Sequence, residues 1–321
     1  MQSRFPVRKL FLLVSLLAFQ VRAQDGFELG GQAGSAFRMG FGARGMATAN
    51  ALSAVSNGDA LSYYNPALTP FQTRPTAFVS TGFLPFDRTL NYVSYVQRLK
   101  PSGGFSVALI NAGVSNIQGR DSDGQPTESY ATSENQFLFS FGTKLAEDFA
   151  VGVSAKILYF SLFQDVKSTT VGFDVGLLYR PSERLTLALV LADINSKYKW
   201  DTSQLYGRDG TTTIDRFPLR RKFAASYAPT FVDGQVSAEV EWVGSILLTR
   251  FGTEISLHKN FGLSAGIDQL DFERRVSPKP TLGFSLKTSW NSWNPVLHYG
   301  YVVEPYSGGG IHVVSLTLGF E

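Results

Sequence analysis

The fold class is decided by two segments, VGVSAKILY at Val151–Tyr159 and VGFDVGLLY at Val171–Tyr179. In both, a large apolar residue stands at nearly every second position, with Gly, Ser, Lys or Asp at most positions between. A period of two residues predicts a β-strand with two chemically different faces. The same alternation recurs after residue 70, where no segment of useful length shows a helical period.

Fourteen such strands are expected, most of them about ten residues long. Their ranges are 75–84, 89–99, 103–112, 135–145, 148–160, 168–180, 183–193, 219–228, 234–244, 248–258, 261–270, 280–290, 295–303 and 311–320. A tilted strand needs about 9–11 residues to cross a bilayer, whereas strands of soluble sheets average five or six. The even count is typical of bacterial outer-membrane barrels. We therefore predict an all-β fold, a 14-stranded antiparallel transmembrane β-barrel over residues 71–321.

The connections between these strands differ in length on the two sides of the predicted barrel. Those after even-numbered strands are short, and the three longest, 113–134, 194–218 and 271–279, all follow odd-numbered strands. Outer-membrane barrels have short periplasmic turns and long outer loops. The pattern places the protein in the outer membrane of a Gram-negative bacterium, with both termini periplasmic.

The second face of the strands is unusual, because Gly, Ser and Ala dominate it and few charges interrupt them. A soluble periplasmic β-sandwich is the competing fold, and its outer face would carry many Lys, Glu, Thr and Asn. Small residues fit a crowded lumen better than a solvated surface, which favours the barrel.

Residues 1–23 are expected to be a cleaved signal peptide. Arg4, Arg8 and Lys9 precede the apolar run 10–19, and Val21-Arg22-Ala23 fits a cleavage site. Cleavage removes four basic residues and no acid, so the formal charge changes from +3 to +3 − 4 = −1. The basic pI therefore belongs to the signal, and no nucleic-acid partner is expected.

Residues 24–70 lack alternation and are predicted to form a hatch, a partly helical plug in the lumen. The Ala-rich stretch 44–55 predicts one short helix. Asn57 or Asp59 could cap a second, which Asn65-Pro66 would end. Fourteen strands enclose a lumen too wide for strand side chains alone to fill, so a plug of this size is expected.

Part of this segment resembles a known family. The matching residues are Gly42-Ala43-Arg44, Met46, Val55 and the run Tyr63-Tyr64-Asn65-Pro66-Ala67-Leu68. They resemble the N-terminal hatch of the PorV/PorQ family of outer-membrane proteins, which is similar to the FadL-type fatty-acid channels. The loop Arg120–Gly124 also looks like the family. Ala47, Ala49 and Asn50 depart from it, since the family usually has glycines there, and Asn57-Gly58 replace a usual Asp pair.

The resemblance implies a function without catalysis. It implies association with type IX protein secretion, as a barrel that holds cargo or a partner. The alternative that it implies is FadL-like passive transport of hydrophobic small molecules, fatty acids or similar. The motif residues that carry these expectations are Gly42, Ala43, Arg44, Met46, Asn65, Pro66 and Ala67.

A guanidinium inside a barrel needs partners, so Arg44 is expected to pair with charges on the inner strand faces. The candidate lumen charges are Lys156, Asp174, Glu239, Glu241, Glu254, Asp268 and Lys287. Two roles are open to Arg44, pinning the hatch and contacting a substrate, and pinning is the simpler interpretation because buried charges are usually paired.

No residues form a catalytic or metal-binding constellation. The chain has no Cys, and its three His fall at different levels and on different faces, so neither a metal nor another cofactor is expected. No Ser-His-Asp spacing supports an enzyme. The loop Asp121-Ser122-Asp123-Gly124 lacks a full calcium-ligand pattern and is interpreted as a hairpin tip.

The predicted partners are outer-membrane lipid and lipopolysaccharide, with secretion-system proteins or a hydrophobic ligand depending on the function. The 194–218 loop and its edge combine aromatic and basic residues, which fits lipopolysaccharide contact, a docking surface or an ordinary interface girdle. These residues are Lys197, Tyr198, Lys199, Trp200, Tyr206, Arg216, Phe217, Arg220 and Arg221.

Overall fold

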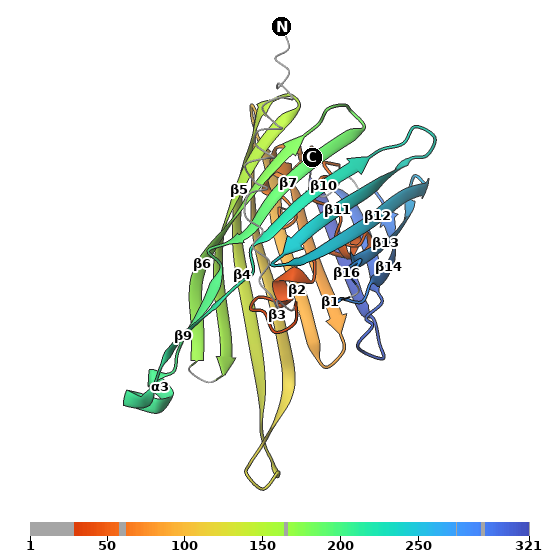
Figure 1. Cartoon of the computed structure of the whole chain (residues 1–321). Helices are drawn as coiled ribbons and strands as arrows, with labels where there is room; N and C mark the ends of the chain where they lie inside the picture. The colour runs from red at the N-terminus through yellow and green to blue at the C-terminus, as the bar shows by residue number, and fades with distance from the viewer. Residues whose placement is uncertain (1–28, 58–61, 164–165, 274, 290–292, 321) are drawn as a thin grey trace.

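The computed structural model describes residues 29–57, 62–163, 166–273, 275–289 and 293–320. The predicted signal peptide lies outside these residues and remains a prediction. Within them, fourteen strands pair antiparallel into one closed barrel, in which β1 and β16 form the closing pair (Figure 1). The predicted fold class is confirmed.

The barrel strands match the predicted ranges in number and order. They are β1 (Thr76–Leu84), β2 (Arg88–Leu99), β3 (Gly103–Arg120), β4 (Pro126–Ala146), β5 (Phe149–Phe163), β6 (Val166–Tyr179), β7 (Leu185–Ile194), β10 (Arg220–Tyr227), β11 (Gly234–Val243), β12 (Ile246–His258), β13 (Phe261–Leu270), β14 (Lys279–Lys287), β15 (Trp293–Val302) and β16 (Ile311–Phe320). Each pairs with its sequence neighbour, except that β7 pairs with β10 across an excursion.

The two ends of the barrel differ. At the end that we call the short-turn end, β2 meets β3 and β4 meets β5 through tight connections, and β16 finishes there. At the long-loop end, the β3–β4 hairpin and the excursion after β7 extend beyond the barrel (Figure 1). The described chain begins at Leu29 near the long-loop end, where it packs against Val243, Ile246 and Leu248.

The predicted loop 113–134 is wrong, because most of it is strand. β3 runs on to Arg120 and β4 begins at Pro126, with Ile117 facing Tyr130 in the ladder. These extensions are largely exposed and polar. A ribbon that stands in water has no apolar face to bury, so the alternation that marked the other strands is missing here.

The predicted loop 194–218 also contains structure. It holds a separate two-stranded sheet of β8 (Lys197–Asp201) and β9 (Thr212–Arg216), joined through α3 (Ser203–Tyr206) and the 3₁₀ helix η3 (Gly207–Asp209). In Figure 1 this hairpin projects from the barrel wall at the long-loop end.

The hatch segment lies inside the barrel, and its described residues contain three short helices, η1 (Ala36–Arg38), α2 (Ala43–Ala47) and η2 (Pro66–Phe71). The helix predicted over 44–55 is much shorter, because Ala49 and Asn50 adopt positive φ angles of 56° and 61° that end it. Asn65-Pro66 was expected to end a helix and instead begins η2, with Asn65 as its N-cap and Pro66 at the first position. Residues 58–61 lie outside the described residues.

Two rows of glycines allow the hatch to touch the barrel backbone. Gly104, Gly142, Gly152 and Gly176 are direct cross-strand partners on β3 to β6 and lie under η2. A Cβ on Gly152 would lie 2.4 Å from the backbone nitrogen of Ala67. The second row lies on β12 to β15 under α2 and comprises Gly252, Gly266, Gly283 and Gly300. Small residues on the inner face therefore exist because backbone, not side chains, fills this space.

The outward face carries the large apolar residues, including Phe139, Phe141 and Leu282, which are 52%, 48% and 61% exposed. A continuous apolar outer surface is the one that a lipid bilayer covers. Among the described residues, no helix has both the length and the apolar character that a membrane-crossing helix needs.

Candidate functional site

The inner wall carries a continuous network of charges that we call the charge belt. It consists of nine residues on seven consecutive strands, β5 to β7 and β10 to β13. Each strand contributes one or two of them, and none is more than 5% exposed. They are Lys156, Asp174, Asp193, Arg220, Lys222, Glu239, Glu241, Arg250 and Asp268.

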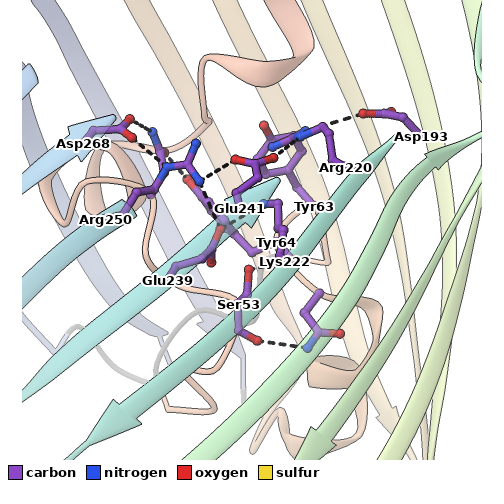
Figure 2. Close-up of polar contacts among 12 residues, drawn as sticks. Ser53, Tyr63, Tyr64, Asp193, Arg220, Lys222, Glu239, Glu241, Arg250 and Asp268 are labelled. Atoms are coloured by element: carbon purple, nitrogen blue, oxygen red, sulfur yellow. Dashed lines mark hydrogen bonds and ion pairs between the residues drawn. The ribbon is translucent and has the colours of Figure 1, made fainter. Parts of the chain in front are cut away.

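The belt begins at Lys156, whose Nζ lies 2.6 Å from Asp174 and 2.8 Å from Asp193. Arg220 continues it, since it reaches Asp193 at 3.6 Å on one side and pairs with Glu241 on the other. Figure 2 shows Asp193, Arg220 and Glu241 in this central part of the belt, next to the hatch ribbon.

Arg250 connects the other end of the belt. It pairs with Glu241, lies 3.4 Å from Glu239 and donates from Nε to Asp268 at 2.6 Å. Lys222 lies 3.3 Å from Glu239 (Figure 2). Each buried charge thus meets an opposite charge, which offsets the cost of removing it from water and fixes the neighbouring strands relative to one another.

Arg44 joins the hatch to the barrel wall. It donates from Nε and Nη2 to the two oxygens of Glu254 at 2.8 and 2.7 Å, and from Nη1 to the Asn57 carbonyl at 3.0 Å. Gln235 also donates to Glu254. Within the described part of the chain, this is the only ion pair between the hatch and a strand. Its geometry is the two-pronged one that guanidinium and carboxylate favour.

The other motif residues have structural positions that explain their type. Gly42 has a φ of 81° and precedes α2, and the backbone nitrogen of Ala43 donates to Ser315 Oγ at 2.7 Å. Ser315 in turn contacts Ser80 across the β1–β16 seam at 2.9 Å. Met46 is buried in the apolar cluster between α2 and the wall.

The Asn65-Pro66-Ala67 string fits the first glycine row. Asn65 Oδ1 accepts from the Ala67 nitrogen at 2.9 Å, and its Nδ2 donates to the Ser53 carbonyl at 2.9 Å. The small Ala67 side chain is fully buried above Gly152. Asparagine here caps η2 and ties it to the preceding hatch loop.

Asn50 links the hatch to the charge belt. Its Nδ2 donates to Asp268 Oδ2 at 2.8 Å, and its Oδ1 accepts from the Tyr64 hydroxyl at 2.8 Å. Ala49 and Asn50 have the positive φ that glycine adopts most easily. Asparagine tolerates this conformation and adds a polar contact.

An aromatic cluster lies between the hatch and the β8 strand at the long-loop end. Tyr198 is its centre, with ring centroids 5.1 Å from Phe160, 5.3 Å from Trp200 and 4.9 Å from Phe217, and Phe37 of the hatch stacks on Phe217. Tyr198 and Phe217 are buried, so the expectation that they contact lipopolysaccharide or form a girdle is wrong. The cluster continues into the apolar inner wall.

That wall is formed by β1 to β5 and meets the belt at β5, which carries both Leu158 and Lys156. Its buried inward side chains are Phe78, Tyr92, Ile110, Leu138 and Leu158. The lumen is therefore divided, with the hatch between an apolar wall and a charged one.

A polar cavity of about 250 Å³ lies beside the Arg44–Glu254 pair, towards the short-turn end. Gln235 and His298 also line it. Lys287 lines the rim of this cavity and is exposed, so it lies apart from the charge belt. Of the other six predicted lumen charges, five belong to the belt. Glu254 is the sixth and pairs with the hatch.

The sequence interpretation missed four belt members, Asp193, Arg220, Lys222 and Arg250. Arg250 lies on the same strand face as Glu254, and Lys222 and Arg220 alternate with Phe223, so the signal was present in the alternation. No group of three or more His, Asp or Glu among the described residues is arranged to hold a metal ion.

Comparisons with known proteins support the fold. No family model matches the sequence, and no curated protein matches it. Among solved structures, the chain is similar to the CymD monoaromatic hydrocarbon channel, with a TM-score of 0.64, 12% identity, and coverage of 88% of this chain and 98% of that one.

Two further solved structures are similar. One is a Pseudomonas aeruginosa FadL homologue, with a TM-score of 0.61, 12% identity, and coverage of 87% of this chain and 97% of that one. The other is the Pseudomonas putida toluene transporter TodX, with a TM-score of 0.58, 12% identity, and coverage of 87% and 96%. These neighbours are channels or transporters rather than enzymes, and the shared feature is the FadL-like barrel fold. None of the comparisons supports the PorV/PorQ resemblance or type IX secretion.

Proposed function

We propose that this protein is a passive channel for hydrophobic small molecules in the outer membrane, with the hatch as its gate. The short-turn end faces the periplasm in this proposal, as in other outer-membrane barrels. The similarity to structures described as hydrocarbon channels and a toluene transporter favours this function over protein secretion.

The observation that carries the proposal is the aromatic cluster at the long-loop end. The partly buried Phe160 and Trp200 pack on the buried Tyr198 and Phe217, so apolar rings continue from the outer hairpin to the hatch. An apolar solute gains by leaving water for such a surface, and aromatic rings stack on aromatic solutes. Beyond the cluster, the hatch blocks the lumen, so movement of the hatch would open the route.

The test is uptake of radiolabelled toluene by intact cells whose own hydrophobic channel has been deleted. The full chain is expected to raise uptake above that of cells with an empty vector. Phe160→Ser and Trp200→Ser should each lower it, because a hydroxyl makes the entry surface polar. Phe231→Ser is the control, since Phe231 is 89% exposed on a turn at the opposite end.

Two results would count against the proposal. Uptake by the full chain that equals that of the empty vector, with folded barrel present in the membrane, would reject transport of this solute. Uptake that is unchanged in the Phe160 and Trp200 variants would reject the aromatic cluster as the entry surface.

A further inference from the structure

Three cations lie together inside the barrel mouth at the short-turn end. Arg98, Lys144 and Arg180 each fall two positions beyond a buried inward residue, on β2, on β4 and just after β6 respectively. Alternation therefore directs all three side chains inward. We call them the cationic triad.

Two of the three side chains meet at one hatch residue, and the third starts from a strand position under the same helix. Lys144 Nζ lies 4.2 Å and Arg180 Cζ lies 5.3 Å from the ring centroid of Phe71, the last residue of η2. Arg98 lies opposite Gly104 in the β2–β3 ladder, and Gly104 lies directly under Thr69 of η2. Small residues stand on the strands between them, because Gly104 of β3 lies opposite Arg98 and Ala150 of β5 lies opposite Lys144.

The triad differs from the charge belt in having no acidic partners. Every belt cation forms an ion pair, whereas none of the ion pairs among the described residues involves Arg98, Lys144 or Arg180. Asp148, on the turn between β4 and β5, pairs with none of them, although Arg180 donates its backbone nitrogen to the Asp148 carbonyl. Like charges held together repel one another, and an anion between them would relieve that repulsion.

We propose that the cationic triad is a binding site for the carboxylate or phosphate group of a small solute at the short-turn mouth. The two guanidinium groups supply paired donors that match either anion, and the ammonium adds a third charge. Phe71 closes the site on the hatch side. The inference does not depend on the proposed transport, because a chain that moves no apolar solute would still hold this site.

The test uses the purified full chain in a non-ionic detergent at about 20 mM salt, where screening is weak. Inorganic phosphate is followed by ³¹P line broadening, and acetate by saturation-transfer proton NMR. The triple variant R98Q/K144Q/R180Q is compared with the control K100Q/R184Q/K259Q, which removes three exposed cations from the same end. Heat-modified migration on gels checks that each variant is a folded barrel.

The full chain is expected to bind at least one of the two anions. Tighter binding of acetate would identify the site as one for carboxylates, and tighter binding of phosphate would identify it as one for phosphates. The triad variant should bind that anion roughly tenfold more weakly, and the control within about twofold of the full chain. If the triad variant does not fold, R98Q and R180Q singly should each weaken binding roughly threefold. Binding of neither anion by the full chain, or equal weakening in the control, would overturn the proposal.

Discussion

At the residue scale, the Arg44–Glu254 pair decides how firmly the hatch is held. Both side chains are largely buried, so removing one leaves the other charge without its partner. We expect Arg44→Met and Glu254→Met each to destabilise the hatch by about 3–5 kcal/mol. The double variant should cost less than the sum by about 1–3 kcal/mol, because no charge is then left alone.

Hydrogen exchange of the amides of Ala43–Ala47 and Thr48 in detergent measures this coupling. The exchange of β5 amides, on the far wall, is the internal control. Strictly additive effects of the two substitutions would show that the pair does not hold the hatch.

Arg250 is the belt residue with the largest expected effect. It forms ion pairs with the carboxylates of Glu239, Glu241 and Asp268. Arg250→Met therefore leaves these three buried negative charges close together without the guanidinium between them. A loss of about 3–5 kcal/mol is expected, seen as a lower unfolding midpoint in urea. Lys287→Met is the matched control, because Lys287 is exposed and belongs to no ion pair among the described residues. An equal midpoint for both variants would contradict the structural role of the belt.

Among the structural elements, the first glycine row determines how closely η2 can pack against the barrel wall, and a substitution there tests this packing. Gly152→Ala puts a Cβ 2.4 Å from the Ala67 nitrogen, whereas Gly82→Ala, also inward-facing, meets nothing closer than 3.4 Å. The first should cost about 1–3 kcal/mol through overpacking, and the second much less. Proteolysis within the hatch should accelerate only in Gly152→Ala. Equal cleavage rates would mean that η2 does not rest on the glycine row.

The same elements show what the sequence could and could not predict. Alternation located all fourteen barrel strands, because each must present one apolar face to lipid. It missed the outer half of the β3–β4 hairpin, where neither face meets lipid. The small residues of the inner face indicated a crowded lumen, yet the hatch helices were placed wrongly. Their limits depend on positive φ at Ala49 and on the Asn65 cap, which are set by the surrounding wall.

At the scale of the whole molecule, the hatch is what closes the lumen. A chain that lacks residues 29–72 should still form a barrel, shown by heat-modified migration, and should conduct ions in planar bilayers as a wide pore. The full chain should conduct little. Similar conductance from both proteins would show that the hatch does not seal the barrel, and a shortened chain that forms no barrel would show that the wall needs its plug.

The seam between β1 and β16 carries a consequence for the order of assembly. Ala43 of the hatch contacts Ser315, and Ser315 contacts Ser80 on the other side of the seam. A segment that precedes all fourteen strands and the last of those strands therefore meet at one point, next to the first strand. A ring of hydrogen-bonded strands that is already shut has no opening in its wall, so a folded segment is enclosed most directly when it is in position before β16 pairs with β1. The contact of Ala43 with Ser315 thus links the position of the hatch to the pairing of β1 with β16, which closes the barrel.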